Sequence, residues 1–485
     1  MVIKGKTGNW NIVVGIEVHA QINTKTKLFS SSAATHDAMP NTQVSFFDIA
    51  SPGQLPVLNM QAVKKAAKTG FAIKGTVNKN SSFDRKHYFY PDLPQGYQIT
   101  QLYHPIVDGG AIEILNENKA KKTIRINRIH IEQDAGKLIH DIYDDKSCVD
   151  LNRAGIPLME IVSEADMTSP HQAVEYVKNL RLLLRAIETS DADMEKGNFR
   201  CDVNISVMRE GETKFGTRCE IKNVNSIRSV ARAIEVEANR HVELIESGEK
   251  VIQQTRLFDA KTETTRKMRN KEEEDDYRYF PDPDLMPLNL SDEFLAEIKA
   301  SLPELPSEKI NRYQSQYSLS YYDAAVLISE KSINDYFEQG VFEAKDTKNF
   351  VNLLLSELLG RTKKGEVELE NCKISAKNLA KLSNCVQIGA ISSKIAKDVM
   401  DIMFETGQDA ETIIKEKNLT QVTDETAIIE SIRKVLSQNP TQVEEFKAGK
   451  VKVVGFLVGL AMKETQGKAN PASLNKLLVE ELSKA

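Results

Sequence analysis

The sequence contains few cysteines and no long apolar run. Its five cysteines are scattered, odd in number and never arranged as Cys-x-x-Cys. This pattern argues against a disulfide framework or a cysteine-rich zinc site and favours a reducing compartment. The longest apolar run, residues 453–462, is too short to cross a bilayer. The first residues show neither a signal core nor a transit pattern, so we expect a cytoplasmic protein.

Familiar nucleotide and hydrolase signatures are also missing. The sequence has no Walker A loop, GxGxxG, GxSxG or HExxH motif, so a nucleotide would have to bind without a familiar phosphate loop. With a net charge of −5, the chain lacks the overall positive charge typical of nucleic-acid-binding proteins. Any contact with RNA must therefore be made by a local basic patch. The length of 485 residues predicts about two to four domains.

Residues 199–225 predict a β-hairpin with one apolar and one polar face. Apolar and polar residues alternate on both sides of a turn that contains Gly211. The polar face could simply meet water, but its mixture of both charges and amides is more typical of a surface that holds an ionic ligand. This face would carry Arg200, Asp202, Asn204, Ser206, Arg218, Glu220 and Lys222.

Residues 11–22 predict another strand. Glu17 and His19 lie two positions apart and therefore point to the same side. A carboxylate and an imidazole on one face suit a divalent cation or an acid–base pair. A hydrogen-bonded surface pair is the alternative.

The same alternation recurs in residues 122–133, where His130 and Glu132 share a face. Glu160 lies near a further short strand within residues 150–164. These segments could contribute more polar groups to the same sheet.

Two segments, residues 83–101 and 275–284, combine basic and aromatic side chains with turn-forming prolines. Such a combination suits stacking and phosphate contacts, as with an adenine or an RNA end, although a rigid structural loop is the alternative. The residues of interest are Arg85, Lys86, Tyr88 and Arg278.

Helical patterns follow. Ser169 and Pro170 predict the N-cap and first turn of a helix over 171–188, and a second helix is expected over 226–247. Beyond residue 291 the strand patterns disappear and apolar residues recur at helical spacing. We predict an α+β fold in which an antiparallel sheet with flanking helices precedes helical segments.

The last segment contains a local basic patch. Lys463 and Lys468 flank a turn formed by Gly467 and residues 470–471. A solvated charged face is the alternative to RNA binding.

The sequence resembles the B subunits of aspartyl/glutamyl-tRNA amidotransferases along its whole length. The motifs that carry the resemblance are GIEVHAQ (15–21), PGQLPVLN (52–59), FDRKHYFYPDLPQGYQ (83–98), IEQDAGK (131–137), NRAGIPLMEIVSE (152–164), RCDVNIS (200–206), EIKNVNS (220–226), QQTRLFD (253–259) and DDYRYFPDPD (275–284). The final VVGFLVGLAMKETQGKANP resembles the tail domain that this family shares with the small YqeY proteins. The resemblance implies a catalytic cradle domain over 1–291, a helical domain over 292–410 and a YqeY-like tail over 411–485.

The resemblance also implies chemistry and partners. A protein of this family uses ATP and Mg²⁺ to phosphorylate the side-chain carboxylate of Glu on tRNA(Gln) or Asp on tRNA(Asn). An amidase subunit supplies ammonia, and a small C subunit clasps the other two. The implied Mg²⁺ ligands are Glu17, His19, Glu132 and Glu160. Substrate or ATP contacts would come from Arg85, Lys86, Tyr88, Asp202, Asn204, Glu220, Lys222 and Arg278, and tRNA contacts from Lys463 and Lys468.

One departure concerns zinc. Many members carry paired cysteines in the regions that read LFSSS (28–32) and VSFFDIASPG (44–53) here. We therefore expect no zinc site and predict that packing alone holds this loop. A non-catalytic tRNA scaffold is the rival function, but bare carboxylates repel RNA phosphates unless a metal intervenes.

Overall fold

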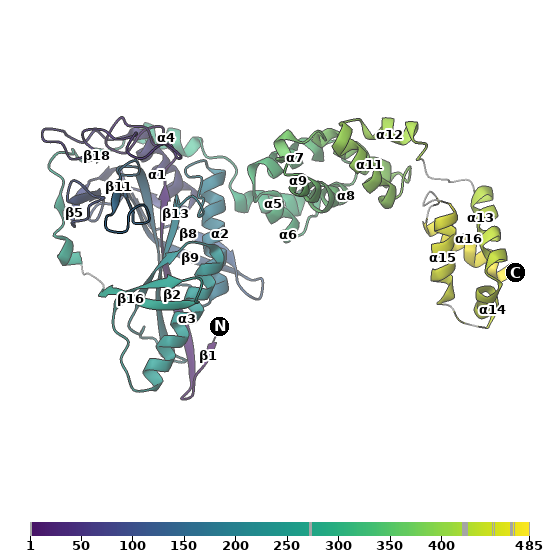
Figure 1. The fold of residues 1–485 in the computed structure, drawn as a ribbon, viewed down its shortest axis with the longest axis horizontal. Helices are drawn as coiled ribbons and strands as arrows, with labels where there is room; N and C mark the ends of the chain where they lie inside the picture. The colour runs from purple at the N-terminus through teal and green to yellow at the C-terminus, as the bar shows by residue number, and fades with distance from the viewer. Residues whose placement is uncertain are drawn as a thin grey trace. The chain divides into compact units, whose positions relative to one another are not determined.

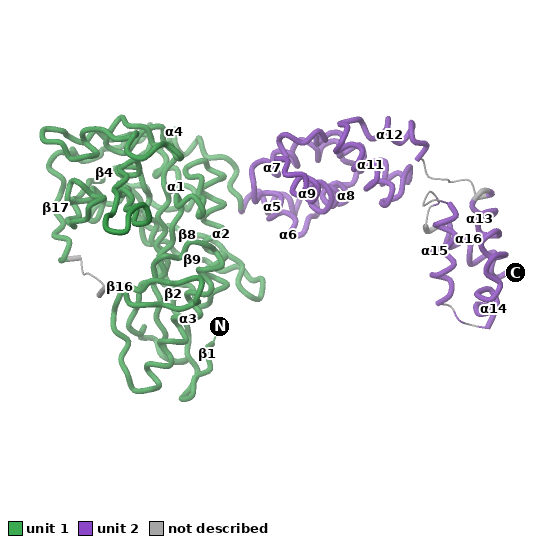
Figure 2. The backbone as a smooth tube through the Cα atoms, viewed as in Figure 1, with its two compact units in different colours: residues 1–306 green, residues 307–485 purple. Residues whose placement is uncertain are grey.

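The computed structural model describes residues 2–270, 274–419, 425–448, 450, 452–465, 469 and 471–484. The chain divides into two compact units, residues 1–306 and 307–485 (Figure 2). Among the described residues, no helix is both long and apolar enough to serve as a membrane span.

An eleven-stranded sheet forms the centre of the first unit (Figure 1). Its order is β16-β15-β14-β13-β2-β12-β9-β7-β3, with β1 paired to β2 and β8 to β9. The strands are β1 (Val2–Lys4), β2 (Asn9–Gln21), β3 (Thr76–Val77), β7 (Val107–Asp108), β8 (Ala111–Leu115), β9 (Lys121–Gln133), β12 (Pro157–Ser163), β13 (Phe199–Arg209), β14 (Cys219–Val224), β15 (Gln254–Asp259) and β16 (Thr264–Asn270). The predicted hairpin is the antiparallel pair β13–β14.

One pair of neighbouring strands departs from the antiparallel arrangement of this sheet. Strands β14 and β15 run parallel, which corrects the prediction of an antiparallel sheet. The reason is the connection between them: helix α3 (Ile227–Glu246) carries the chain back to the starting end of the sheet, as a parallel pair requires.

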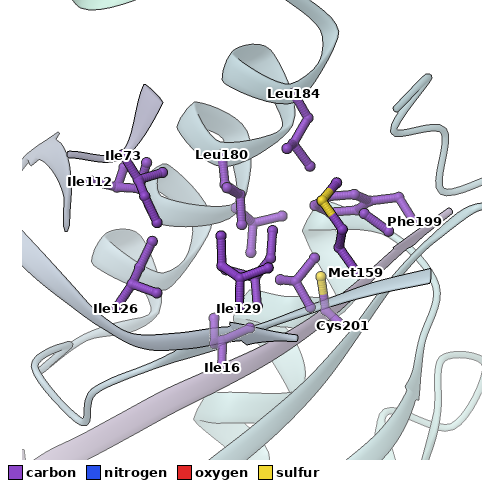
Figure 3. Close-up of a cluster of buried hydrophobic side chains, with 14 of the residues drawn as sticks. Ile16, Ile73, Ile112, Ile126, Ile129, Met159, Leu180, Leu184, Phe199 and Cys201 are labelled. Carbon is purple, nitrogen blue, oxygen red and sulfur yellow. The ribbon is translucent and has the colours of Figure 1, made fainter. Parts of the chain in front are cut away.

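Helices cover the apolar face of this sheet. They are α1 (Met60–Ala72), α2 (Pro170–Ala186) and α3. Figure 3 shows Leu180 and Leu184 of α2 over Ile129 and Met159 of the sheet, and all four are fully buried. Each such side chain stabilises the fold by about 1.5–3 kcal/mol relative to an exposed position. The opposite face of the central strands is thereby left for polar side chains.

The start of α2 confirms the predicted cap, and α3 begins with a cap of the same kind. The Ser169 side chain accepts a hydrogen bond from the backbone N–H of Gln172, and Pro170 opens α2. The Ser226 side chain accepts one from the backbone N–H of Ser229 at the start of α3. Both serines therefore satisfy backbone donors that have no partner within the helix.

Small sheets surround the main one. The first joins β17 (Phe280–Pro281), β5 (Asp84–His87) and β6 (Tyr97–Thr100). The second pairs β10 (Lys137–Ile139) with β11 (Cys148–Asp150), and the third pairs β18 (Leu288–Asn289) with β4 (Asn80–Ser81). The 3₁₀ turn η1 (Glu274–Tyr277) precedes β17.

The first unit extends past the expected boundary at residue 291. Helix α4 (Asp292–Ala300) packs on α1, with Leu295 and Ile298 buried in the core of this unit. The Nζ atom of Lys64 also lies 2.6 Å from Oε1 of Glu297. The chain therefore divides after residue 306.

A buried ion pair holds the loop before α1, which corrects the prediction that packing alone does so. The Nζ atom of Lys27 lies 3.1 Å from Oδ2 of Asp48, and the two side chains are 0% and 1% exposed. The hydroxyl of Ser30 and the backbone N–H of Ser45 also donate to Asp48. These contacts join residues 27–30 to residues 45–48.

The second unit is helical. Its elements are α5 (Pro306–Tyr317), α6 (Tyr321–Leu327), α7 (Lys331–Val341), α8 (Thr347–Asn352), the π-helical turn η2 (Leu353–Leu358), α9 (Leu359–Lys364), the 3₁₀ turn η3 (Leu369–Asn371), α10 (Ala376–Gln387), α11 (Ser393–Thr406), α12 (Ala410–Glu416), α13 (Glu425–Gln438), α14 (Pro440–Lys447), α15 (Val453–Glu464) and α16 (Pro471–Lys484). Helix α12 packs on α10 and α11, whereas buried side chains of α13, α14, α15 and α16 form a separate hydrophobic cluster. The expected boundary after residue 410 would therefore separate α12 from α10 and α11, the helices on which it packs.

Candidate functional site

The polar face of the central sheet gathers side chains from strands that are far apart in sequence. Antiparallel register places Glu160 of β12 opposite His19 of β2 on one side and opposite His130 of β9 on the other. Glu132 lies two residues beyond His130 and shares its face. The three strands therefore bring two imidazoles and two carboxylates into one cluster.

Distances within this cluster are short. The Nε2 atom of His19 lies 3.6 Å from Oε1 of Glu132 and 3.5 Å from Oε2 of Glu160. The Nε2 atom of His130 lies 2.8 Å from Oε2 of Glu160. The Thr100 hydroxyl donates to Oε2 of Glu132 at 3.3 Å.

The charges of this cluster are strongly coupled. Burial lowers the pKa of His19, but the carboxylates of Glu160 and Glu132 outweigh burial and raise it to about 9. The pKa of His130 also rises to about 9, because the same carboxylates again outweigh burial. Burial opposes ionisation of Glu160, yet the two imidazoles hold the pKa of this carboxyl well below its usual value. Positive charge is thus favoured between the two glutamates.

This donor set fits a divalent cation. One ligand atom from each of His19, Glu132 and Glu160 lies within 4.8 Å of the other two. Mg²⁺ prefers oxygen ligands and usually keeps several waters, so two carboxylates suffice to anchor it. An imidazole is more typical of Mn²⁺ and other transition metals.

A second polar group lies on the neighbouring strands β13 and β14. The Nζ atom of Lys222 lies 2.6 Å from Oδ2 of Asp202 and 3.1 Å from Oε1 of Glu220. Burial lowers the pKa of Lys222, but these two carboxylates outweigh it and raise the pKa above its usual value. The Asn204 amide donates to Oε1 of Glu17 at 2.8 Å, which ties β13 to β2.

One cavity of about 1030 Å³ is lined by both groups. Its wall also contains Lys86, Phe215, Tyr277 and Tyr279. The Nζ atom of Lys86 lies 4.6 Å from the centroid of the Tyr277 ring, because β17 pairs with β5 and joins the two basic and aromatic segments. The cavity therefore offers carboxylates, two imidazoles, lysines and aromatic rings to one bound molecule.

Comparison with known proteins identifies this architecture. Residues 12–296 match the GatB/GatE catalytic domain, and residues 335–482 match the GatB domain. The chain belongs to the GatB family. Over 481 residues it is 55% identical to the B subunit of the aspartyl/glutamyl-tRNA(Asn/Gln) amidotransferase of Rickettsia rickettsii (strain Sheila Smith), with 99% of each chain covered. The corresponding B subunits of Rickettsia canadensis and Rickettsia typhi are 55% and 54% identical over 480 residues, again with 99% of each chain covered. The resemblance inferred from the motifs is confirmed.

The remaining predicted site residues of this GatB family member lie in different surroundings. Arg85 is not among the cavity-lining residues: its Nε and Nη2 atoms lie 2.8 Å and 2.6 Å from the carboxylates of Asp282 and Asp284. Through these two ion pairs, Arg85 holds residues 282–284 next to β5. Tyr88 is also absent from the cavity-lining residues, and burial together with the charges of Glu132 and Asp134 raises the pKa of its hydroxyl.

Arg278 and the tail lysines lie elsewhere. Arg278 is exposed, and its carbonyl oxygen lies 3.1 Å from Nδ1 of His87. Lys463 is exposed near the end of α15, whereas Lys468 lies outside the described residues.

Two features of the cavity were not predicted from the sequence. His130 was expected on the same face as Glu132, but period-two alternation does not reveal that it lies directly opposite Glu160. Phe215 belongs to the turn between β13 and β14, which was expected to be a polar turn with no part in the site. The presence of one aromatic residue in an otherwise polar hairpin turn was the available signal for Phe215.

Proposed function

We propose that this chain is the phosphorylating subunit of a tRNA-dependent amidotransferase. Its substrates are ATP and the side-chain carboxylate of Glu on tRNA(Gln) or of Asp on tRNA(Asn). The carboxylate oxygen attacks the γ-phosphorus, the bond to ADP breaks, and an acyl phosphate forms. Ammonia then attacks the acyl carbon, phosphate leaves, and the amide of Gln or Asn results.

The observation that carries this proposal is the single cavity in which the His19, Glu132 and Glu160 cluster and the Lys222 group meet. Phosphoryl transfer needs positioned charges more than covalent chemistry from the protein. In the proposal, His19, Glu132 and Glu160 hold a divalent cation. Glu17, which was also predicted as a ligand, instead groups with Asp202 and Glu220 on the neighbouring strands. A cation bound there neutralises charge on phosphate oxygens.

The chain's own residues supply the other positions. Lys86 and Lys222 line the cavity and present ammonium groups to phosphate oxygens. Asp202, Asn204 and Glu220 orient Lys222 and β13, and the rings of Tyr277 and Tyr279 offer stacking surfaces. Arg85 acts indirectly in this proposal, by fixing the segment that carries Tyr277.

The proposed partners follow from the chemistry. The sequence shows no Ser/Lys amidase pattern or Cys–His glutaminase context, so ammonia must come from an amidase subunit. The relatives are named as B subunits of an amidotransferase, which indicates a multi-subunit enzyme. We propose a heterotrimer with the amidase subunit and a small C subunit, with the mischarged tRNA held partly by the tail.

The test is the reconstituted trimer, assayed for ATP cleavage and amide formation with each mischarged tRNA. Glu132→Gln should lower tRNA-dependent ATP cleavage by several orders of magnitude while tRNA affinity stays within about twofold. Glu113→Gln is the matched control, because Glu113 is exposed on β8 and its carboxylate forms an ion pair with the exposed Lys121. Binding of tRNA without any stimulation of ATP cleavage would instead indicate a scaffold.

A further inference from the structure

His130 contacts the proposed cation ligands differently from His19. Its Nε2 atom lies 2.8 Å from Oε2 of Glu160 and forms a close ion pair with it, whereas the corresponding distance for His19 is 3.5 Å. This difference follows from the sheet, because His130 is directly opposite Glu160 on the adjacent strand β9. Since an ionised carboxylate has no proton to donate, this contact favours a proton on Nε2 of His130.

The two imidazoles also lie near different oxygens of Glu132. His19 faces Oε1 at 3.6 Å, whereas His130 faces Oε2 at 3.6 Å and shares that oxygen with the Thr100 hydroxyl. The His130 side chain is 7% exposed, compared with 20% for His19. His130 and Thr100 thus form a buried, hydrogen-bonding side of the cluster, and His19 is on the more accessible side.

We propose that His130 is a positioning residue: its Nε2–H group holds the carboxylates of Glu160 and Glu132 in the orientation in which they and His19 bind the divalent cation. This inference rests on the proposed function of the cavity. The Nδ1 atom of His130 is buried and has no hydrogen-bond partner among the described residues. The contact of Nε2 with the two carboxylates is therefore what holds the imidazole ring in place. Groups that orient metal ligands typically change metal affinity by about 10–100-fold when they are removed.

The experiment measures Mn²⁺ binding to the full-length chain by electron paramagnetic resonance, without ATP or tRNA. His130→Leu fills a similar volume but removes the N–H donor, and it should weaken Mn²⁺ binding about 10–100-fold. His130→Gln places an amide N–H near the position of Nε2 and should restore most of the affinity. His171→Leu, at an exposed histidine of α2, is the matched control and should bind Mn²⁺ as the wild type does.

A pulsed measurement of the ¹⁴N coupling to bound Mn²⁺ separates a positioning residue from a ligand. The wild type should show one coordinated imidazole, and this coupling should survive in His130→Gln and disappear in His19→Ala. Two coordinated imidazoles in the wild type would overturn the proposal even if His130→Leu failed to fold. Wild-type affinity in a folded His130→Leu would also overturn it.

The outcomes distinguish this inference from the proposed function. If the wild type shows no imidazole-bound Mn²⁺, both the cation site and the role of His130 are wrong. If one imidazole is bound and His130→Leu has no effect, only the role of His130 is wrong. ATP-dependent amide formation by the trimer tests the overall function independently.

Discussion

The Nζ atom of Lys222 lies 2.6 Å from Oδ2 of Asp202 across the pair of strands β13 and β14. The ammonium group is thereby held at the cavity between two carboxylates, and its raised pKa keeps it charged at neutral pH. A side chain held in place before the substrate arrives loses little entropy when it contacts a phosphate.

The first prediction is that Lys222→Met lowers kcat/KM for ATP by about 100-fold or more, because one preorganised donor to the transferring phosphate is lost. Lys222→Arg keeps the charge and should lose less. Lys261→Met, at an exposed lysine in the turn between β15 and β16, should behave as the wild type. The measurement is tRNA-dependent ATP cleavage by the trimer. An unchanged rate in Lys222→Met would remove Lys222 from the site.

The second prediction concerns pH. The pKa of His19 is about 9, so at pH 7 a cation must displace its proton. Cation affinity should therefore rise with pH by up to about tenfold per unit and level off above about pH 9. Calorimetric Mn²⁺ titrations in buffers of different ionisation enthalpy would measure the proton released. Binding without proton release at pH 7 would contradict this assignment of His19.

The third prediction concerns the buried pair Lys27–Asp48. Lys27→Met leaves the Asp48 carboxylate buried without its cation, which should lower the free energy of unfolding by about 3–5 kcal/mol. Adding Asp48→Leu should recover part of the loss, because no buried charge then remains. Trp10 is the only tryptophan and is buried in the same unit, so its fluorescence reports denaturant unfolding of that unit.

The control for this prediction is the exposed pair Lys64–Glu297, in which the side chains are 33% and 66% exposed. Lys64→Met should cost less than about 1 kcal/mol, because water already solvates both charges. Equal losses in Lys27→Met and Lys64→Met would show that burial does not set the strength of these pairs.

The fourth prediction concerns the tail. If Lys463 and Lys468 contact tRNA phosphates, replacing both with Ala should weaken tRNA binding and flatten its salt dependence by about one to two units of log–log slope. Turnover at saturating tRNA should hold while KM rises, because the catalytic cavity is unchanged. Removing residues 411–485 should have a larger effect, although this truncation also removes α12. Identical salt slopes for the wild type and both variants would exclude RNA contacts by the tail.

Much of the first unit was decided by local sequence. The alternation of residues along β2, β9 and β13 determined which side chains face the core and which share the polar face, because successive residues of a strand point to opposite sides. Ser169 and Ser226 determined where α2 and α3 begin, because a serine side chain can bond backbone donors only a few residues away. Glu17, His19, Glu132 and Asp202 could therefore be placed on polar strand faces from the sequence by itself.

Only the tertiary structure decided which strands are neighbours. The order of β2, β12 and β9 makes Glu160 the meeting point of His19 and His130, and the return of residues 280–281 to β5 brings Tyr277 to Lys86. The buried Lys27–Asp48 pair and the packing of α4 on α1 likewise join segments that carry no local signal of each other. Periodicity acts within one segment, whereas pairing and burial depend on the free energy of all segments packed together. The sequence thus determined the face on which each polar side chain lies, and the assembled sheet decided which of them meet.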